Sequence, residues 1–303
     1  MVSLDRDSMT KDNAIIFSLT PPFSFRGKKE RTKESKGGNA QMTYTTLLFD
    51  VKDSIAHITL NRPTAANSIN EEMGKDLMHA ALRCDEDPEI RAVLISGAGK
   101  MFSGGGDLKD FSAKGNQLPY YIKEVTTYFH AAMSRLTRMD APVVAAVHGA
   151  VAGAGLSIAI ACDIVVAAET TRFMVAYTRA GLTPDGSATY FLPRIVGLKR
   201  ALELTLTNRT FSAQEALQWG LVTRVVPDNQ LLVQARTIAV QLATGPTRAY
   251  GVSKRLLHSG WAETLETQME NESQAIANSA RSSDAREGIT AFLEKRPPKF
   301  KGI

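Results

Sequence analysis

Short β-rich segments alternate with helical segments from residue 45 to residue 168, and this alternation limits the possible folds more than any other feature. Such a pattern is typical of α/β domains, in which helices cover a sheet. Asn70 is a good N-cap for the first of the helices. The predicted strands are 45–51, 55–60, 92–96, 142–147 and 164–168, and the predicted helices are 71–83, 120–138 and 150–161.

From Leu198 onwards the sequence predicts mostly helices. Their expected ranges are 198–207, 212–219, 229–243, 245–257, 262–280 and 284–294. We therefore divide the chain into an α/β core, residues 42–245, and a helical C-terminal region, residues 246–303. A helical region that follows a complete core is a natural place for subunit contacts.

The first 41 residues differ from the rest of the chain. They contain Pro21-Pro22, a basic run from Arg26 to Lys36 and the pair Gly37-Gly38, with no sustained apolar periodicity. Such a segment cannot bury enough apolar surface to offset its ordering entropy. We expect a disordered tail at 1–41, with Met42 as the working start.

Charge and cysteine content exclude several classes of protein. The net charge of +5 is mild, and it suits an anionic ligand at least as well as nucleic acid, which we do not expect to bind. The two cysteines, Cys84 and Cys162, form no CxxC motif, so neither a disulfide scaffold nor a paired-cysteine zinc site is expected. No apolar run approaches the roughly 20 residues that cross a bilayer. We expect a soluble, cytoplasmic protein without a metal site.

Two glycine-rich stretches are the strongest local candidates for chemistry. Residues 102–107 (FSGGGD) and 149–155 (GAVAGAG) each follow a predicted strand and precede a helix. Glycines there allow close approach of a ligand to bare N–H groups. Two such loops can direct two backbone N–H groups at one oxygen and form an oxyanion hole. The alternative is a pair of tight turns that serve packing alone. Neither stretch fits a P-loop or a dinucleotide fingerprint.

Four segments of the chain carry a recognisable pattern when they are taken in order. They are Ile58 to Pro63 with Ala66 to Ser68, Phe102 to Leu108, Ala145 to Gly149 through Asp163, and Ala291 to Pro298. Together they resemble the crotonase superfamily, which contains the enoyl-CoA hydratases and isomerases, and the resemblance extends over residues 43–303.

This resemblance implies a crotonase fold, a spiral of ββα units with a helical C-terminal region. It implies an oxyanion hole formed by the N–H groups of Gly106 and Ala154, which would hold a thioester oxygen. Backbone at Ala65 and Ala66 would bind the adenine of coenzyme A. By the same resemblance, the C-terminal region would supply Phe292 and Lys295 to the CoA of a neighbouring subunit, in a trimer or a dimer of trimers. Coenzyme A is then part of the substrate, and no separate cofactor is expected.

The pattern of the hydratases is broken at two positions. Ser157 and Tyr177 stand where the resemblance places the two glutamates that activate water. Serine and neutral tyrosine do not replace two carboxylates that act as acid and base near neutral pH. Ordinary hydration is therefore doubtful for this chain.

One acid remains in the matching segment. Asp185, in the stretch from Gly181 to Gly186, resembles the proton-transferring aspartate of the phenylacetate-pathway epoxyphenylacetyl-CoA isomerase branch, and also the nucleophile of 4-chlorobenzoyl-CoA dehalogenases. His130 falls where those dehalogenases have a general base. The alternative roles are structural: Asp185 as a helix N-cap, and His130 as a partly buried helix residue. Asp107 is predicted to be a helix cap and His148 to be structural.

The leading hypothesis is an acyl-CoA thioester isomerase in which Asp185 moves a proton between two carbons of an enolate. One carboxylate suffices for this shift, whereas addition of water favours two acid/base groups. The alternatives are an enoyl-CoA hydratase, a hydrolytic aryl-CoA dehalogenase, and a non-catalytic homologue that binds CoA or RNA.

Overall fold

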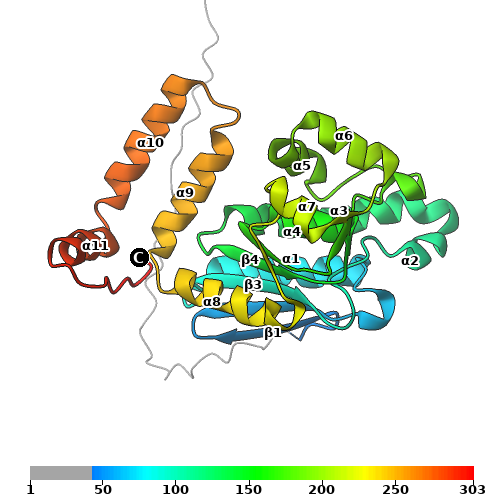
Figure 1. The fold of residues 1–303 in the computed structure, drawn as a ribbon, viewed down its shortest axis with the longest axis horizontal. Coiled ribbons are helices and arrows are strands. Elements are labelled where there is room, and N and C mark those ends of the chain that lie inside the picture. Colours follow the sequence, from blue (N-terminus) through cyan, green and yellow to red (C-terminus); the bar gives the residue numbers. More distant parts are fainter. Residues whose placement is uncertain (1–42) are drawn as a thin grey trace, which may run out of the picture. The chain divides into compact units, whose positions relative to one another are not determined.

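Residues 43–303 are described by a computed structural model (Figure 1). The tail predicted for residues 1–41 lies outside this range. The described residues form eleven α-helices and two sheets, which confirms the predicted α/β class. No helix among them is long and apolar enough to cross a membrane.

The main sheet has six strands in the order β1-β2-β3-β4-β6-β9. The first pair is antiparallel, and every other neighbouring pair is parallel. The central strand β4 is buried along its whole length, as expected for a parallel sheet with both faces covered. The strands are β1 (Leu47–Lys52), β2 (Ile55–Leu60), β3 (Ala92–Gly97), β4 (Val143–Val147), β6 (Ile164–Ala168) and β9 (Arg224–Val226).

The hairpin of β1 and β2 follows the predicted ranges closely. Asp53 and Ser54 form its two-residue turn with φ angles of 55° and 59°. Left-handed backbone at both positions matches the twist of the flanking strands. The predicted N-cap of the next helix is also confirmed, because the side chain of Asn70 accepts a hydrogen bond from the Met73 N–H at 3.0 Å.

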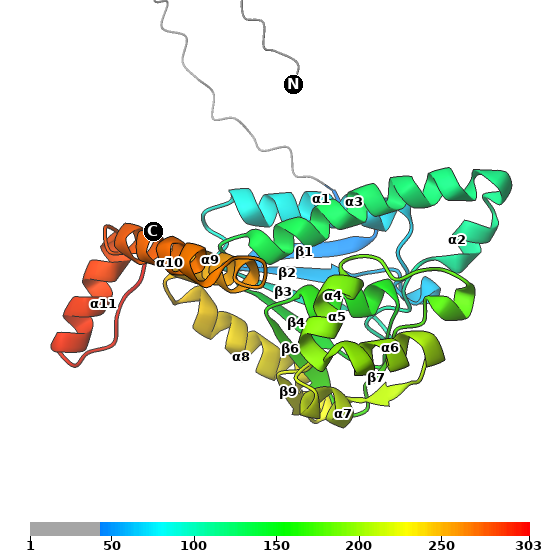
Figure 2. The same ribbon diagram turned by 90° about the horizontal axis from the view of Figure 1, so that it is seen from above.

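Helices cover both faces of the main sheet (Figure 2). On one face, α1 (Glu71–Glu86) and α3 (Leu118–Arg138) pack together and bury a large apolar cluster with the sheet. On the other face, α8 (Leu231–Ala243) packs Leu231, Ala235 and Ala239 onto the sheet. The remaining helices of the core are α2 (Leu108–Ser112), α4 (Ala154–Ala161), α5 (Ala188–Val196), α6 (Leu198–Thr207) and α7 (Ala213–Gln218).

A second, three-stranded sheet corrects one prediction. The helix predicted for 150–161 begins only at Ala154, because its first three residues form strand β5 (Ala150–Ala152), which pairs with β7 (Arg172–Met174). Strand β8 (Phe211–Ser212) completes this sheet. The chain turns from β5 into α4 at Gly153, where φ is 51°. The small residues at 150–152 also suit a helix, but backbone hydrogen bonds to a distant strand keep this segment extended.

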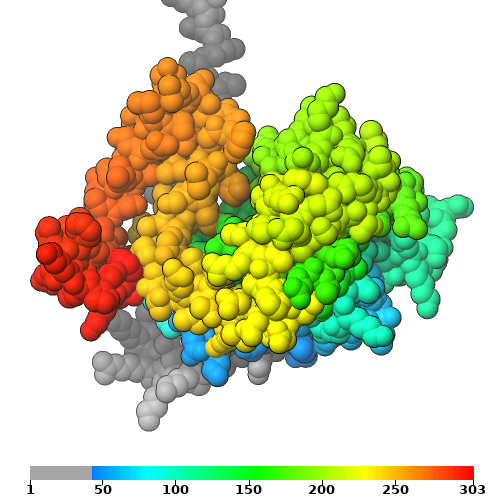
Figure 3. All heavy atoms as spheres, in the orientation of Figure 1, coloured from blue at the N-terminus to red at the C-terminus, as the bar shows by residue number. Residues whose placement is uncertain are grey.

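The C-terminal region is helical, as predicted. It consists of α9 (Thr247–Ser259), α10 (Leu265–Ser279) and α11 (Ser283–Leu293). An ion pair of 2.7 Å between Lys254 Nζ and Asp163 Oδ2 connects α9 to the core. In contrast, α10 has no buried residue, and Figure 3 shows α10 and α11 standing out from the body of residues 43–303. The predicted roles of residues 246–303 in oligomerisation and CoA contact stay predictions.

Candidate active site

The first glycine loop is held in place by Asn67. This side chain is fully buried. The two hydrogens of its Nδ2 are shared among three backbone oxygens at the start of the loop, those of Ala98 (2.8 Å), Met101 (2.9 Å) and Phe102 (3.1 Å). Its Oδ1 accepts a hydrogen bond from the Arg62 N–H at 2.8 Å. A single amide therefore satisfies several buried backbone groups and fixes the approach to residues 104–106.

The two glycine loops are joined to each other. Ser103 N–H donates to the oxygen of Ala150, and Ala152 N–H donates to the oxygen of Ser103. Next to this bridge Gly105 has a φ of 100°, and a Cβ there would lie 3.0 Å from the oxygen of Ala152. Glycine is thus required at 105 both by conformation and by close packing. The two glycine loops therefore lie side by side.

Gly106 and Ala154 present free N–H groups at this junction. Both residues line one cavity, and within residues 43–303 neither N–H donates a hydrogen bond to another group of the chain. Ala154 is also the first residue of α4, where backbone N–H groups have no partner within the helix and the helix dipole is positive. This geometry suits an oxygen that gains negative charge during a reaction. The oxyanion role itself remains a prediction.

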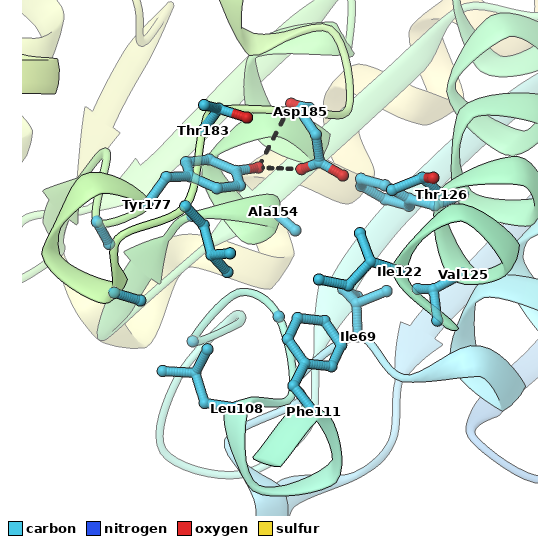
Figure 4. Close-up of a pocket in the computed structure, with 17 residues that line it drawn as sticks. Ile69, Leu108, Phe111, Ile122, Val125, Thr126, Ala154, Tyr177, Thr183 and Asp185 are labelled. Atoms are coloured by element: carbon cyan, nitrogen blue, oxygen red, sulfur yellow. Dashed lines mark hydrogen bonds between the residues drawn. The ribbon is translucent and has the colours of Figure 1, made fainter. Parts of the chain in front are cut away.

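The cavity has a volume of about 270 Å³ and is mostly apolar (Figure 4). Asp185 is the only acidic side chain among the described residues that line it. Figure 4 shows Ile69, Leu108 and Phe111 across the cavity from Tyr177 and Asp185. The apolar lining also includes Ile122, Val125, Phe129, Ala176, Ala180 and Leu182. Such a cavity fits an acyl group whose polar end lies near the two N–H groups.

Asp185 accepts hydrogen bonds from Tyr177 and Ser157, the residues that stand where the resemblance places the two glutamates of the hydratases. The phenol of Tyr177 donates a 2.6 Å hydrogen bond to Asp185 Oδ1. Ser157 Oγ lies 2.8 Å from the Tyr177 oxygen and donates to the backbone oxygen of Asp185 at 2.9 Å. The helix-cap alternative for Asp185 is wrong, because Ser187 is the N-cap of α5 and no side chain caps that helix.

Tyr177 is a hydrogen-bond donor in this cluster because its hydroxyl stays protonated. Burial raises the pKa of Tyr177 far above its ordinary value, and the neighbouring charge of Asp185 raises it further. The phenol therefore donates to Oδ1 of Asp185, and Oδ2 remains available to accept a proton.

His130 lies beside that free oxygen. Its Nε2 is 3.5 Å from Asp185 Oδ2 and accepts a hydrogen bond from the Gly186 N–H at 3.1 Å. The Gly186 contact requires an unprotonated Nε2, whereas an ion pair with Asp185 requires a protonated one. The side chain is 52% exposed, so His130 is more open to solvent than the partly buried alternative predicted.

The residues predicted to bind CoA fall into two groups. Ala65 and Ala66 lie directly beside the first glycine loop, since Gly104 N–H donates to the oxygen of Ala66 at 2.8 Å. Phe292 and Lys295 lie at the end of α11, far from α2 and the cavity, and Phe292 is 83% exposed (Figure 1). The predicted contact of these two residues with CoA in a neighbouring subunit is not tested by a single chain.

Asp107 is a helix cap, as predicted, since its side chain accepts a hydrogen bond from Asp110 N–H at 3.1 Å. It also pairs with Arg62 at 2.9 Å. Burial acts to raise the pKa of Asp107, but the Asp110 and Arg62 hydrogen bonds outweigh it and lower that pKa.

His148 contacts the backbone oxygen of Gly99, in keeping with a structural role. Residues 43–303 contain no group of three or more acidic, histidine or cysteine side chains arranged to hold a metal ion.

Comparison with known proteins agrees with this geometry. The enoyl-CoA hydratase/isomerase family model matches residues 50–303. A probable enoyl-CoA hydratase of Rhodobacter capsulatus is 38% identical over 86% of this chain and 100% of its own length. The 1,2-epoxyphenylacetyl-CoA isomerase of Escherichia coli is 38% identical over 84% of this chain and 98% of its own.

Two further relatives add to the comparison. The 4-chlorobenzoyl coenzyme A dehalogenase-2 of Arthrobacter sp. is 33% identical over 80% of this chain and 88% of its own. The crystal structure of an enoyl-CoA hydratase from Polaromonas sp. JS666 superposes with a TM-score of 0.81, is 32% identical, and covers 84% of this chain and 99% of that one. The predicted crotonase fold is thereby confirmed, and the chain is an enzyme that belongs to the enoyl-CoA hydratase/isomerase family.

Proposed function

We propose that this enzyme is an acyl-CoA thioester isomerase, which moves a double bond along the acyl chain through an enolate. The observation that carries the proposal is the single carboxylate of Asp185 in an otherwise apolar cavity, beside two free backbone N–H groups. The N–H groups of Gly106 and Ala154 would bind the thioester oxygen and stabilise its negative charge. Two preorganised donors of this kind strengthen as charge develops on the oxygen.

Asp185 would transfer the proton. Its Oδ2 would take a proton from C2 of a 3-enoyl thioester, and the electrons would move into the dienolate. The same oxygen would return the proton at C4 and give the 2-enoyl thioester. Because Tyr177 holds Oδ1, the acceptor oxygen has a fixed position in the cavity. A base held in place in this way gains from orientation as well as from basicity.

The same cluster argues against hydration. Addition of water needs one group to activate water and another to donate a proton. Tyr177 donates its hydroxyl hydrogen to Asp185, and Ser157 Oγ lies 2.8 Å from the Tyr177 oxygen. The raised pKa of the phenol keeps Tyr177 protonated, so it cannot take a proton from water. We therefore rank the hydratase below the isomerase.

A hydrolytic aryl-CoA dehalogenase is the second candidate, and one observation favours it. His130 lies next to Asp185, as a general base would for hydrolysis of an aspartyl ester. In that reaction Asp185 would attack the ring carbon, chloride would leave, and water would then cleave the ester. The relative from Arthrobacter sp. carries that activity in its name. Against it, Gly106 stands where the resemblance places an aromatic residue.

A substrate panel tests the proposal directly. The purified full-length protein would be incubated with 3-enoyl-, 2-enoyl- and 4-chlorobenzoyl-CoA, and the products analysed by mass spectrometry. We expect conversion of 3-enoyl- to 2-enoyl-CoA. Clean formation of 3-hydroxyacyl-CoA would establish the hydratase, and release of chloride would establish the dehalogenase. We also propose that the active form is a trimer or a dimer of trimers.

A further inference from the structure

A second cleft borders His130 and shares none of its described lining residues with the acyl cavity. It has a volume of about 690 Å³ and is formed by α3, α5, α9 and the residues after α9. Figure 3 shows a hollow between α9 and the body of the core. Most of the residues that line it have a polar or charged side chain, among them Arg138, Arg255, His258 and Glu263. These side chains can hold water in the cleft, although much of the lining surface is apolar.

His130 separates the two spaces. It lines the second cleft, whereas Asp185 lines the acyl cavity, and their side chains approach to 3.5 Å between Nε2 and Oδ2. The other oxygen of Asp185 is occupied by Tyr177 at 2.6 Å. The free oxygen of the carboxylate thus has the acyl cavity on one side and a half-exposed imidazole on the other.

A bound acyl chain would block the access of water to Asp185 from the acyl cavity. When an acyl group fills the apolar cavity, its bulk excludes water from that side of the carboxylate. A proton taken from the substrate can then reach solvent only past other protein groups. Among the described residues, His130 is a titratable side chain that both lies beside Asp185 Oδ2 and lines the second cleft.

We propose that His130 exchanges protons between Asp185 and water in the second cleft while the acyl chain is bound. This inference rests on the proposed isomerase function. After Asp185 Oδ2 has gained a proton from the substrate, Oδ2–H gives that proton to Nε2, and the imidazolium releases a proton to water in the cleft. The reverse transfer brings a proton from water back to Oδ2, so over the two transfers the protein neither gains nor loses a proton.

The geometry allows this transfer with a small movement. In the neutral ring Nε2 accepts a hydrogen bond from Gly186 N–H. To receive a proton it must leave that N–H and approach Oδ2, and 3.5 Å is a distance that catalytic pairs commonly shorten once substrate is bound. His258 lines the same cleft without lining the acyl cavity, so it provides a matched control.

Isotope retention tests the proposal. Trans-3-hexenoyl-CoA fully deuterated at C2 would be converted by the full-length enzyme in ordinary water, and deuterium at C4 of the product measured by mass spectrometry. We expect the wild type to lose most of the transferred label. His130→Gln, which can still accept from Gly186 but cannot relay a proton, should retain about threefold more label, with turnover reduced by less than about tenfold. His258→Gln should match the wild type.

A rescue experiment makes the test independent of any loss of structure. His130→Ala should retain label like His130→Gln, and added imidazole, which fits the cleft, should lower retention again. A purely structural role for His130 would not respond to imidazole. Label retention equal to wild type in folded His130→Gln, or a wild type that already retains nearly all label, would overturn the inference. A wild type that moves no double bond would overturn the proposed function and, with it, this inference.

Discussion

The phenol oxygen of Tyr177 lies 2.6 Å from Oδ1 of Asp185 and donates a hydrogen bond to it. Tyr177 precedes Asp185 by eight residues, and a short 3-10 turn and the loop after it bring the two side chains together. Because the partly buried phenol stays protonated, the contact is a charge-assisted hydrogen bond that fixes the carboxylate.

Replacement of Asp185 by Asn should abolish most activity and leave the fold intact. Asn keeps the size of the side chain and an oxygen that can accept from Tyr177, but it cannot take a proton. We expect turnover to fall by about 10²–10⁴-fold, the usual contribution of a general base. Steady-state assays and thermal unfolding would be measured together. Isomerisation at the wild-type rate by a folded variant would rule out Asp185 as the base.

Replacement of Tyr177 by Phe removes only the hydroxyl. The carboxylate then loses the donor that fixes Oδ1, so Oδ2 is no longer held in place for proton transfer. We expect kcat to fall by about tenfold and the free energy of unfolding to fall by about 1–3 kcal/mol, as for a lost hydrogen bond to a charged group. Separate measurement of kcat and KM distinguishes a positioning role, which lowers kcat, from a packing role, which alters KM as well. Ser157→Ala, which keeps the Tyr177–Asp185 contact, should lower kcat less than Tyr177→Phe does.

Replacement of Gly106 by Val should block the thioester oxygen. A Cβ at this position would lie 3.0 Å from the ring of Phe111, so the ring or the loop must give way, and the bulk of valine would stand beside the N–H that binds the oxygen. Loss of one such donor raises the activation free energy by about 3–4 kcal/mol. The ratio kcat/KM is the quantity to measure. Gly260→Val, at the exposed end of α9, is the control and should behave like wild type; equal activity in both variants would refute the assigned oxyanion hole.

Replacement of Asn67 by Ala should destabilise the protein. The change leaves three buried carbonyl oxygens without the Asn67 donor and places alanine at a φ of 49°. We expect the free energy of unfolding to fall by about 2–4 kcal/mol. Urea denaturation gives this value, and exposed Asn229→Ala serves as the reference. A loss no larger than that of Asn229→Ala would mean that other groups hold the glycine loop.

The sequence predicts the long elements of this fold well, because they combine several consistent local signals. The hairpin at β1 and β2 has alternation on both sides of a turn, and α1 has both a cap and an apolar stripe. Strands β5, β7 and β8 have two or three residues each, too few to show a period. Their existence depends on pairing between segments distant in sequence, which no local pattern records.

The sequence was enough to select individual residues of the candidate site, but not the contacts between them. The glycine loops, Asp185 and His130 could be selected from motifs. The link from Tyr177 and Ser157 to Asp185 could not, because it depends on rotamers that point three side chains at one spot. Asn67 was missed as a support for the loop, although its place within the matched segment from Ala66 to Ser68 was a signal that could have indicated a buried amide.

Helix α10 carries a consequence for how this protein unfolds. A helix of 15 residues is marginal in water unless it packs against something, and α10 has no buried residue. Leu265, Met269 and Ile276 on it are all more than half exposed. Its contacts with α9, such as the hydrogen bond from Gln268 Nε2 to the oxygen of Leu256, bury none of its residues. The stability of α10 must then either be low or be raised by association, and in the second case it depends on protein concentration. At high dilution the helical signal of this segment should melt at a lower temperature than the sheet, as a separate transition.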